Sequence, residues 1–401
     1  MTSDAVSPKG LTTVLVLAMA VGFLPWFAIS ALGPFLVRDL EAGAALPGLL
    51  VGVLFGAGAC WSRLVGGGIR RWGARNMLLT LFLAAAVSLL VMAVAPNTGW
   101  LVAIVVLCGL PIAVPMPAST AMASALLPPA RRGPSIGVAQ SGQQMGALGA
   151  GLFLPPLALA AGWRVALAAT ALAAVVGFVA TTRLPAVVDV RTRGAPGGVG
   201  NAASRAPRGL PLFALVMSAW TVGTVAYLPL HGTQQLGFSE SLAGGLVTAV
   251  GLVAIAGKIS WGYLTSRSRS DVAPMLGLAL AGAAALVTVA GSTALPGLVW
   301  VGAILFGASA ISWPVVSLTV LTRRLAPDAV GTASGRVMAA GFIGATIGPI
   351  AFGVLVERAG FTVGWLTGAL VYATAAVVAL ASSLRDDGVE SRLARQGVRP
   401  S

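Results

Sequence analysis

Twelve runs of mostly apolar residues divide the chain, and this pattern limits its fold more than any other feature. A helix needs about 20 such residues to cross the hydrocarbon core of a bilayer. Of the 401 residues, 57% are hydrophobic and only 9% are charged, whereas a water-soluble domain needs roughly 25% charged residues to cover its surface. Lipid must therefore surround most of the exterior, and we expect an all-α membrane protein.

The predicted spans form two groups of six. The first group covers residues 11–36, 46–66, 76–95, 99–126, 134–160 and 163–182, and the second covers 210–231, 241–264, 273–291, 296–321, 329–356 and 361–382. The stretch between them is rich in Gly, Pro, Ser and Arg and has no periodicity, which is typical of a linker. We predict a six-helix bundle over 1–185, a linker over 186–209, a second bundle over 210–384 and a tail over 385–401.

The positive charge lies on one side of this arrangement. If the spans alternate in direction, 22 of the 25 Lys and Arg residues belong to one set of loops and the two termini, counting Arg63, Lys258 and Arg336 in the adjoining span ends. The other set holds only Arg38, Arg164 and Arg358. The positive-inside rule then places both termini and the linker in the cytoplasm. Because the net charge of +14 is confined to short loops, no nucleic-acid partner is expected.

The two groups of spans repeat each other at a steady offset. Pro34 and Pro229 are 195 residues apart; Gly48, Gly66 and Arg71 lie 196 residues before Gly244, Gly262 and Arg267; Gly137, Ala139 and Pro155 lie 194 residues before Gly331, Ala333 and Pro349. Prolines also break the fourth span and its partner, the tenth. A parallel repeat of this kind predicts two bundles related by an axis along the membrane normal, with a substrate site between them.

The loop after the second span carries a family signature. It reads Gly66-Gly-Gly-Ile-Arg-Arg-Trp-Gly-Ala-Arg75 and resembles the major facilitator signature Gly-x-x-x-Asp-Arg-x-Gly-x-Arg, matching at Gly66, Arg71, Gly73 and Arg75. Arg70 replaces the Asp, and Ser266 does so in the equivalent loop of the second half, Gly262 to Arg267. In that family the loop is thought to hold the cytoplasmic side closed. Without the Asp residues, we expect Arg71 and Arg267 to pair with helix C-termini.

The sequence around the fifth span resembles one subgroup of that family. The stretch from Arg132 through Gln-Ser-Gly at 140–142 to Trp163 and Arg164 resembles bacterial permeases of the cyanate and nitroimidazole type and related organic-anion permeases. In that group a Lys often precedes Gln-Ser-Gly, and Ala139 stands there instead, which argues against an anionic substrate. The resemblance implies a bacterial inner-membrane transporter that works by alternating access as a monomer.

Polar and aromatic side chains within the spans are the candidates for substrate contact. Gln140 shares a helical face with Gln143 and Gln144, and this face either lines the cavity or bonds a neighbouring helix. Trp26, Trp220 and Trp313 lie on helices that line the cavity in the resembled fold, although ordinary packing is an equal reading. His231, beside Tyr227, is either a substrate-contacting group near the outer mouth or an exposed interfacial histidine.

Apart from Arg164 at the start of the sixth span, three basic residues lie within predicted spans. Arg336 either faces the cavity or extends to the inner interface. Arg63 and Lys258 are nearer to span ends, so we expect their side chains to extend to the interface. All 11 carboxylates fall in loops, tails or span ends, so coupling to a proton would need His231 or an end residue such as Asp39.

No enzyme motif, metal cluster or cofactor motif is recognisable, so we expect neither catalysis nor a cofactor. The expected function is secondary active transport of a small organic solute, and the sparse charge favours a neutral or weakly polar one. Efflux of a drug or secondary metabolite is the alternative within the same class. A non-transporting membrane sensor is a distant alternative, because such proteins usually carry a soluble output domain.

Overall fold

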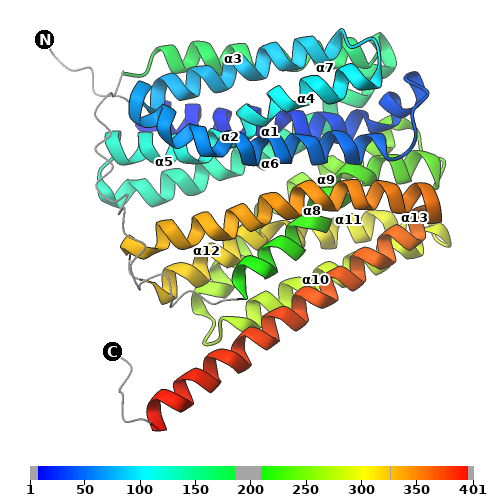
Figure 1. The fold of residues 1–401 in the computed structure, drawn as a ribbon. Coiled ribbons are helices and arrows are strands. Elements are labelled where there is room, and N and C mark those ends of the chain that lie inside the picture. The colour runs from blue at the N-terminus through cyan, green and yellow to red at the C-terminus, as the bar shows by residue number, and fades with distance from the viewer. Residues whose placement is uncertain (1–7, 186–208, 326, 396–401) are drawn as a thin grey trace, which may run out of the picture.

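The computed structural model describes residues 8–185, 209–325 and 327–395, and these residues form long helices that run along one common direction (Figure 1). The first half contains α1 (Pro8–Asp39), α2 (Leu46–Trp72), α3 (Ala74–Ala93), α4 (Thr98–Ala113), α5 (Pro115–Leu126), α6 (Pro129–Ala161) and α7 (Trp163–Thr182). The second contains α8 (Leu210–Gln234), α9 (Glu240–Arg267), α10 (Val272–Ala290), η2 (Gly291–Thr293), α11 (Leu298–Ala308), η3 (Ala310–Ser312), α12 (Trp313–Arg324) and α13 (Pro327–Arg395).

The described residues provide twelve crossings, as the apolar runs predicted. Eleven helical segments are long and apolar enough to span a membrane, and the last of them, Ala333–Ala381, contains two spans. Gly360 divides α13, because its φ of 82° and ψ of 170° are not helical. A left-handed φ favours glycine, so the expected boundary between the spans at 329–356 and 361–382 is confirmed.

The fourth and tenth spans are both broken in the middle. Val114 separates α4 from α5, which begins at Pro115. In the second half, η3 separates α11 from α12, whose second residue is Pro314. Proline fits the first turn of a helix, where its missing N–H group costs nothing, so each proline begins a new helix after the break.

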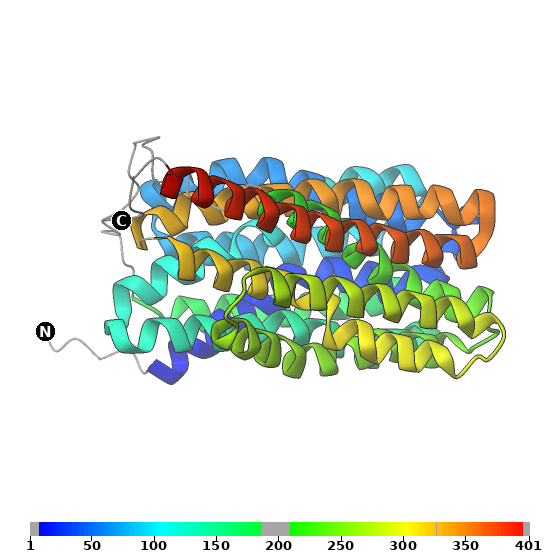
Figure 2. The ribbon, with the colours of Figure 1, turned by 90° about the horizontal axis from the view of Figure 1, so that it is seen from below.

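The helices pack as two six-span bundles side by side, with the first above the second in Figure 1. Figure 2, seen from below, shows helices of the second bundle in front of the first. Contacts between the bundles run mainly from α2 to α13, from α6 to α9 and from α1 to α8. The expected linker, 186–209, lies almost wholly outside the described residues, so its extent stays a prediction. The final helix continues to Arg395, into the stretch expected to be a tail.

The two ends of the molecule differ in charge. One end, here called the arginine-rich end, carries Arg71, Arg75, Arg183, Arg267 and Arg324 among others. The opposite, arginine-poor end is formed by the end of α1 at Asp39, the start of α2, the start of α9 at Glu240 and the bend at Gly360. This difference follows the loop asymmetry seen in the sequence.

Candidate functional site

The interface between the bundles is tightest where a glycine of one half meets a proline of the other. A Cβ atom on Gly48 of α2 would overlap the backbone oxygen of Pro349 in α13, and one on Gly244 of α9 would overlap the ring of Pro155 in α6. Gly48 and Gly244 are partners in the internal repeat, and so are Pro155 and Pro349. The two interfaces therefore repeat each other, and both allow close backbone approach.

Lys258 is a basic residue within a span that the structure places in this interface. Its Nζ atom donates a hydrogen bond to Gln143 Oε1 over 3.2 Å, from α9 to α6. Nine residues separate Lys258 from Arg267 at the helix end, a rise of about 14 Å. The expectation that Lys258 extends to the membrane interface is therefore wrong, because its side chain turns inward to the other bundle.

The other described contacts between the bundles lie between this hydrogen bond and the arginine-poor end. They include the approach of Thr346 to Gly52 and Gly56 and the hydrogen bond from Thr248 Oγ1 to the Leu148 carbonyl. Gly142, the residue next to Gln143, instead packs within the first bundle against Val16. Among the described contacts between the bundles, the one of Lys258 with Gln143 thus lies nearest the arginine-rich end.

The other glutamines predicted on the fifth span occupy different environments. Gln144 is buried, and its Oε1 atom has no hydrogen-bond partner among the described residues. Gln140 is half-buried. Gln143 bonds a neighbouring helix, which is one of the two readings of the sequence, and its place in a substrate cavity stays a prediction.

The three tryptophans divide between the bundles. Trp26 stacks on Phe27 with ring centroids 4.4 Å apart and meets the edge of Phe55 at 5.3 Å. Phe55 in turn lies 6.0 Å from Phe342 of the second half. These residues form an aromatic layer across the interface, and we keep Trp26 as a candidate for substrate contact.

The other two tryptophans are built into the second bundle. Trp220 Nε1 donates to the Gly364 carbonyl over 3.3 Å. Trp313 is buried at the start of α12, where its ring fills the space beside Gly341. Both have packing partners that explain their burial, and their contact with a substrate stays a prediction.

His231 lies in the interior of the second bundle. It is fully buried, its Nε2 atom is 2.8 Å from Ser292 Oγ, and its ring packs against Phe361 and Trp365. All three partners belong to the same bundle. The reading as an exposed interfacial histidine is wrong, and the described contacts of the ring do not reach the interface between the bundles.

Two other predicted residues are placed clearly. Tyr227 lies at the interface, but its hydroxyl is engaged by the backbone of α2 and is considered further below. Arg336 is exposed, nine residues into α13. Its role in substrate binding stays a prediction, as does that of Tyr227.

The signature loop has the backbone that its glycine requires. Gly73 has a φ of 83°. It follows the last residue of α2 and directly precedes α3. Arg75 donates through Nε and Nη2 to the carbonyls of Thr181 and Thr182 at the end of α7, at 3.3 and 2.7 Å. An arginine does pair with a helix C-terminus here, but it is Arg75 rather than Arg71.

The remaining signature residues have other surroundings. Arg71 lies over the ring of Trp72 at 6.0 Å, and Arg267 over Tyr263 at 4.4 Å. The expected pairing of these two arginines with helix C-termini is therefore not what the structure describes. Gly66 is exposed, and Gly262 is half-buried, with Val315 3.2 Å from its Cβ position.

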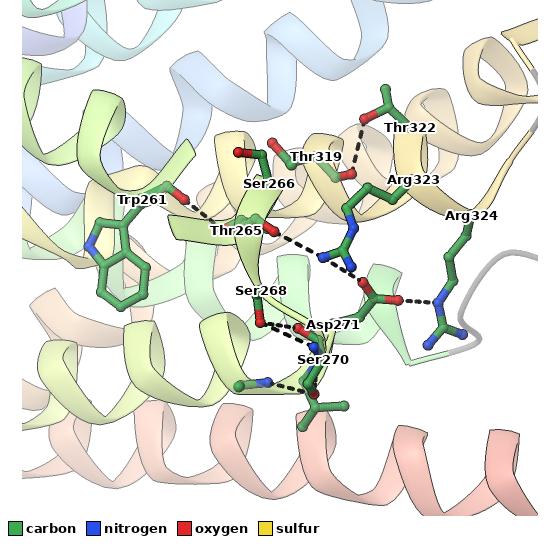
Figure 3. Close-up of polar contacts among 12 residues, drawn as sticks. Trp261, Thr265, Ser266, Ser268, Ser270, Asp271, Thr319, Thr322, Arg323 and Arg324 are labelled. Atoms are coloured by element: carbon green, nitrogen blue, oxygen red, sulfur yellow. Dashed lines mark hydrogen bonds and ion pairs between the residues drawn. The ribbon is translucent and has the colours of Figure 1, made fainter. Parts of the chain in front are cut away.

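A carboxylate outside the signature ties the equivalent loop of the second half. Asp271 pairs with Arg323 Nη1 at 3.2 Å and with Arg324 Nε, and Arg323 also donates to the Thr265 carbonyl over 2.9 Å (Figure 3). This cluster joins the end of α9, the start of α10 and the end of α12. The sequence offered only one signal for it, which is an Asp four residues after Arg267.

The comparisons with known proteins agree with this architecture. The family described as Major Facilitator Superfamily matches residues 15–335. A probable nitrate/nitrite transporter, NarK2 of Mycobacterium tuberculosis, is 31% identical over 94% of this chain and 97% of its own length.

Solved structures show the same fold. A bacterial homologue of the human lysosomal transporter Spinster, in an inward-facing and occupied conformation, superposes with a TM-score of 0.74 at 17% identity, covering 94% of this chain and 96% of its own. The nucleoside transporter NupG gives 0.70 at 14% identity, with coverage of 93% and 98%. The chain therefore belongs to the Major Facilitator Superfamily and is a multi-pass secondary transporter rather than an enzyme.

Proposed function

We propose that this transporter moves a small oxyanion of the nitrate or nitrite class, and that Lys258 provides the positive charge that binds it. The carrying observation is the position of Lys258 in the interface with a neutral amide as its hydrogen-bond partner. The carboxylates of the described spans lie at helix ends, as do Asp39, Glu240 and Glu357. A cation inside a membrane protein marks a substrate or ion path by default.

The geometry of the pair suits an acceptor-rich solute. Gln143 Oε1 accepts from Lys258, so the two N–H donors of the Gln143 amide remain available for a ligand. The ammonium group of Lys258 has three donors and uses one of them on Gln143. An oxyanion placed here would accept hydrogen bonds from both bundles, which is the contact that alternating access requires.

The repeat supplies a second cation for the same path. Arg63 lies 195 residues before Lys258, and this spacing falls within the 194–196 residues that separate repeat partners in the two halves. It also follows Gly52 by 11 residues, or about three helical turns, so it continues the face of α2 that packs on α13. Arg63 is exposed, and we propose that it attracts the anion to the space between the bundles.

The relative supports the choice of anion. The probable nitrate/nitrite transporter aligns over nearly the whole chain, and this likeness outweighs the argument from Ala139 against an anion. A second candidate, efflux of a planar organic solute, is favoured by the aromatic layer of Trp26, Phe55 and Phe342.

We also propose an orientation and a state. The arginine-rich end faces the cytoplasm of a bacterial inner membrane, by the positive-inside rule. The contacts at the arginine-poor end then close the outer side, and the structure represents the inward-open form. We propose that transport is driven by exchange for a second anion rather than by proton symport. A relay of carboxylates is the usual proton path, whereas the interior of the described spans carries a lysine.

Proteoliposomes test this proposal. Vesicles loaded with nitrite and diluted into ¹⁵N-nitrate should accumulate the label, and Lys258→Gln should lower the rate by at least tenfold. Lys9→Gln, which removes an exposed lysine at the start of α1, is the matched control and should leave the rate within twofold. Equal rates for wild type and Lys258→Gln would reject the role of Lys258, and no nitrate uptake by wild type would reject the anion.

A further inference from the structure

The helix α2 begins at the arginine-poor end without a cap of its own. Its N-cap residue is Ala45, which has no side-chain oxygen, and Pro47 follows in the first turn. The free N–H groups at a helix N-terminus need hydrogen-bond partners. In a capping box, the N-cap side chain accepts from the N–H group of the third helical residue, N3, and the N3 side chain accepts from the N–H group of the N-cap residue. In α2 these two N–H groups belong to Gly48 and Ala45.

Tyr227 satisfies the first of these groups from the other bundle. Its hydroxyl oxygen accepts from the Gly48 N–H over 3.1 Å and donates to the Ala45 carbonyl over 3.3 Å. The side chain is fully buried and stacks on Phe352, with centroids 4.7 Å apart. Tyr227 is therefore held rigidly by the second bundle while its hydroxyl serves the first.

Glu357 satisfies the second group. Its Oε1 atom accepts from the Ala45 N–H over 2.9 Å, and it approaches so closely that a Cβ atom on Gly43 would overlap it. A carboxylate is also favoured there because the N-terminus of a helix carries partial positive charge. Nearby, Arg38 pairs with Glu240 at 2.6 Å and joins α1 to α9.

We infer that Tyr227 and Glu357 form a capping box for α2 across the bundle interface, and that this box is the gate that closes the outer side. The inference rests on the alternating access proposed above. When the bundles part at the arginine-poor end, Ala45 and Gly48 lose both partners together, so the first turn of α2 passes to water as the outer side opens. Opening thus costs three hydrogen bonds at a single place, one of them to a charged group.

Distances between spin labels at the arginine-poor end test this gate. Labels on Gly99→Cys in α4 and on Ala294→Cys, just before α11, report on the first and the second bundle. Both positions are exposed, so each can carry a label. Cys60 is exposed and is replaced by Ser, whereas Cys108 is buried and stays. Tyr227→Phe should raise the ratio of the longer-distance to the shorter-distance population about three- to tenfold over wild type, as expected for losing neutral hydrogen bonds. Glu357→Ala, which removes a bond to a charged group, should raise this ratio by about ten- to a hundredfold.

The controls separate a gate from general loosening. Tyr372→Phe removes a buried hydroxyl that bonds Thr221 within the second bundle, so it should leave the distances unchanged. Glu357→Gln keeps an acceptor for Ala45 and should shift them less than Glu357→Ala. Unchanged distances in both gate variants, or an equal shift in Tyr372→Phe, would overturn the gate. Failure of nitrate uptake with the gate shifts intact would reject the substrate and leave the gate standing.

Discussion

Lys258 Nζ lies 3.2 Å from Gln143 Oε1, and this hydrogen bond joins α9 of the second bundle to α6 of the first. Gln143 belongs to the glutamines that the sequence marks on the fifth span, whereas Lys258 was expected at the membrane interface. The pair therefore gives the proposed anion path a residue from each half.

Gln143→Leu should weaken transport of nitrate without abolishing it. The variant keeps the charge of Lys258 but removes the amide that orients the ammonium group and offers its own donors. One lost hydrogen bond to a charged group is worth roughly 1.5–3 kcal/mol, so the KM for nitrate exchange should rise by about ten- to a hundredfold. Gln140→Leu, on the same helix, is the control. A similar KM for both variants would show that Gln143 has no special role.

Gly48→Ala should destabilise the closed arginine-poor end. A Cβ atom at Gly48 would overlap the Pro349 carbonyl, which is backbone and cannot rotate away. Overpacking of this kind typically costs about 1–3 kcal/mol, and in this transporter it should appear as a larger population with that end open. The spin-label distance between positions 99 and 294 measures this change.

Gly149→Ala is the matched control for that prediction. Gly149 also lies in a spanning helix, but a Cβ atom there would meet nothing within 4 Å. It should leave the distance unchanged. If both alanines gave the same distances as wild type, close approach at Gly48 would not limit opening.

Much of the fold could be predicted because it depends on local patterns. The apolar runs set the twelve crossings, and the repeat of Gly48 and Pro155 with Gly244 and Pro349 predicted two equivalent halves that the structure brings together as equivalent interfaces. The surroundings of single side chains could not be predicted in this way. Lys258 follows Gly251 by seven residues, so it lies on the helix face that packs against α6, but only the partner helix reveals that this face is an interface.

The capping of α2 illustrates the same limit more strongly. A capping box is normally recognised from residues three apart in sequence, whereas Tyr227 and Glu357 lie 179 and 312 residues from their partners. Likewise, Asp271 replaces the missing signature carboxylate from outside the motif. Such contacts depend on the packing of whole helices, which a single sequence does not specify.

Asp271→Asn should lower stability with little effect on the substrate path. Asp271 is mostly buried, pairs with Arg323 and Arg324 and ties three helix ends together. Removing its charge leaves two arginines facing each other, and we expect a loss of about 1–3 kcal/mol in the free energy of unfolding. Thermal unfolding in detergent measures this loss. Arg269→Ala, at an exposed position of the same loop, should be neutral, and an equal loss there would contradict the role of Asp271.

His231→Phe should leave transport within about twofold of wild type, because the histidine contacts residues of its own bundle. Phenylalanine fills a similar volume beside Phe361 and Trp365, and Ser292 keeps its hydrogen bond to the Val289 carbonyl at 2.6 Å. His231→Ala, in contrast, leaves a cavity in the core and should cost about 2–4 kcal/mol of stability. Nitrate exchange is measured per folded protein, so that loss of protein is not mistaken for loss of turnover. A hundredfold lower rate of nitrate exchange in His231→Phe, with folding intact, would show that this histidine takes part in transport.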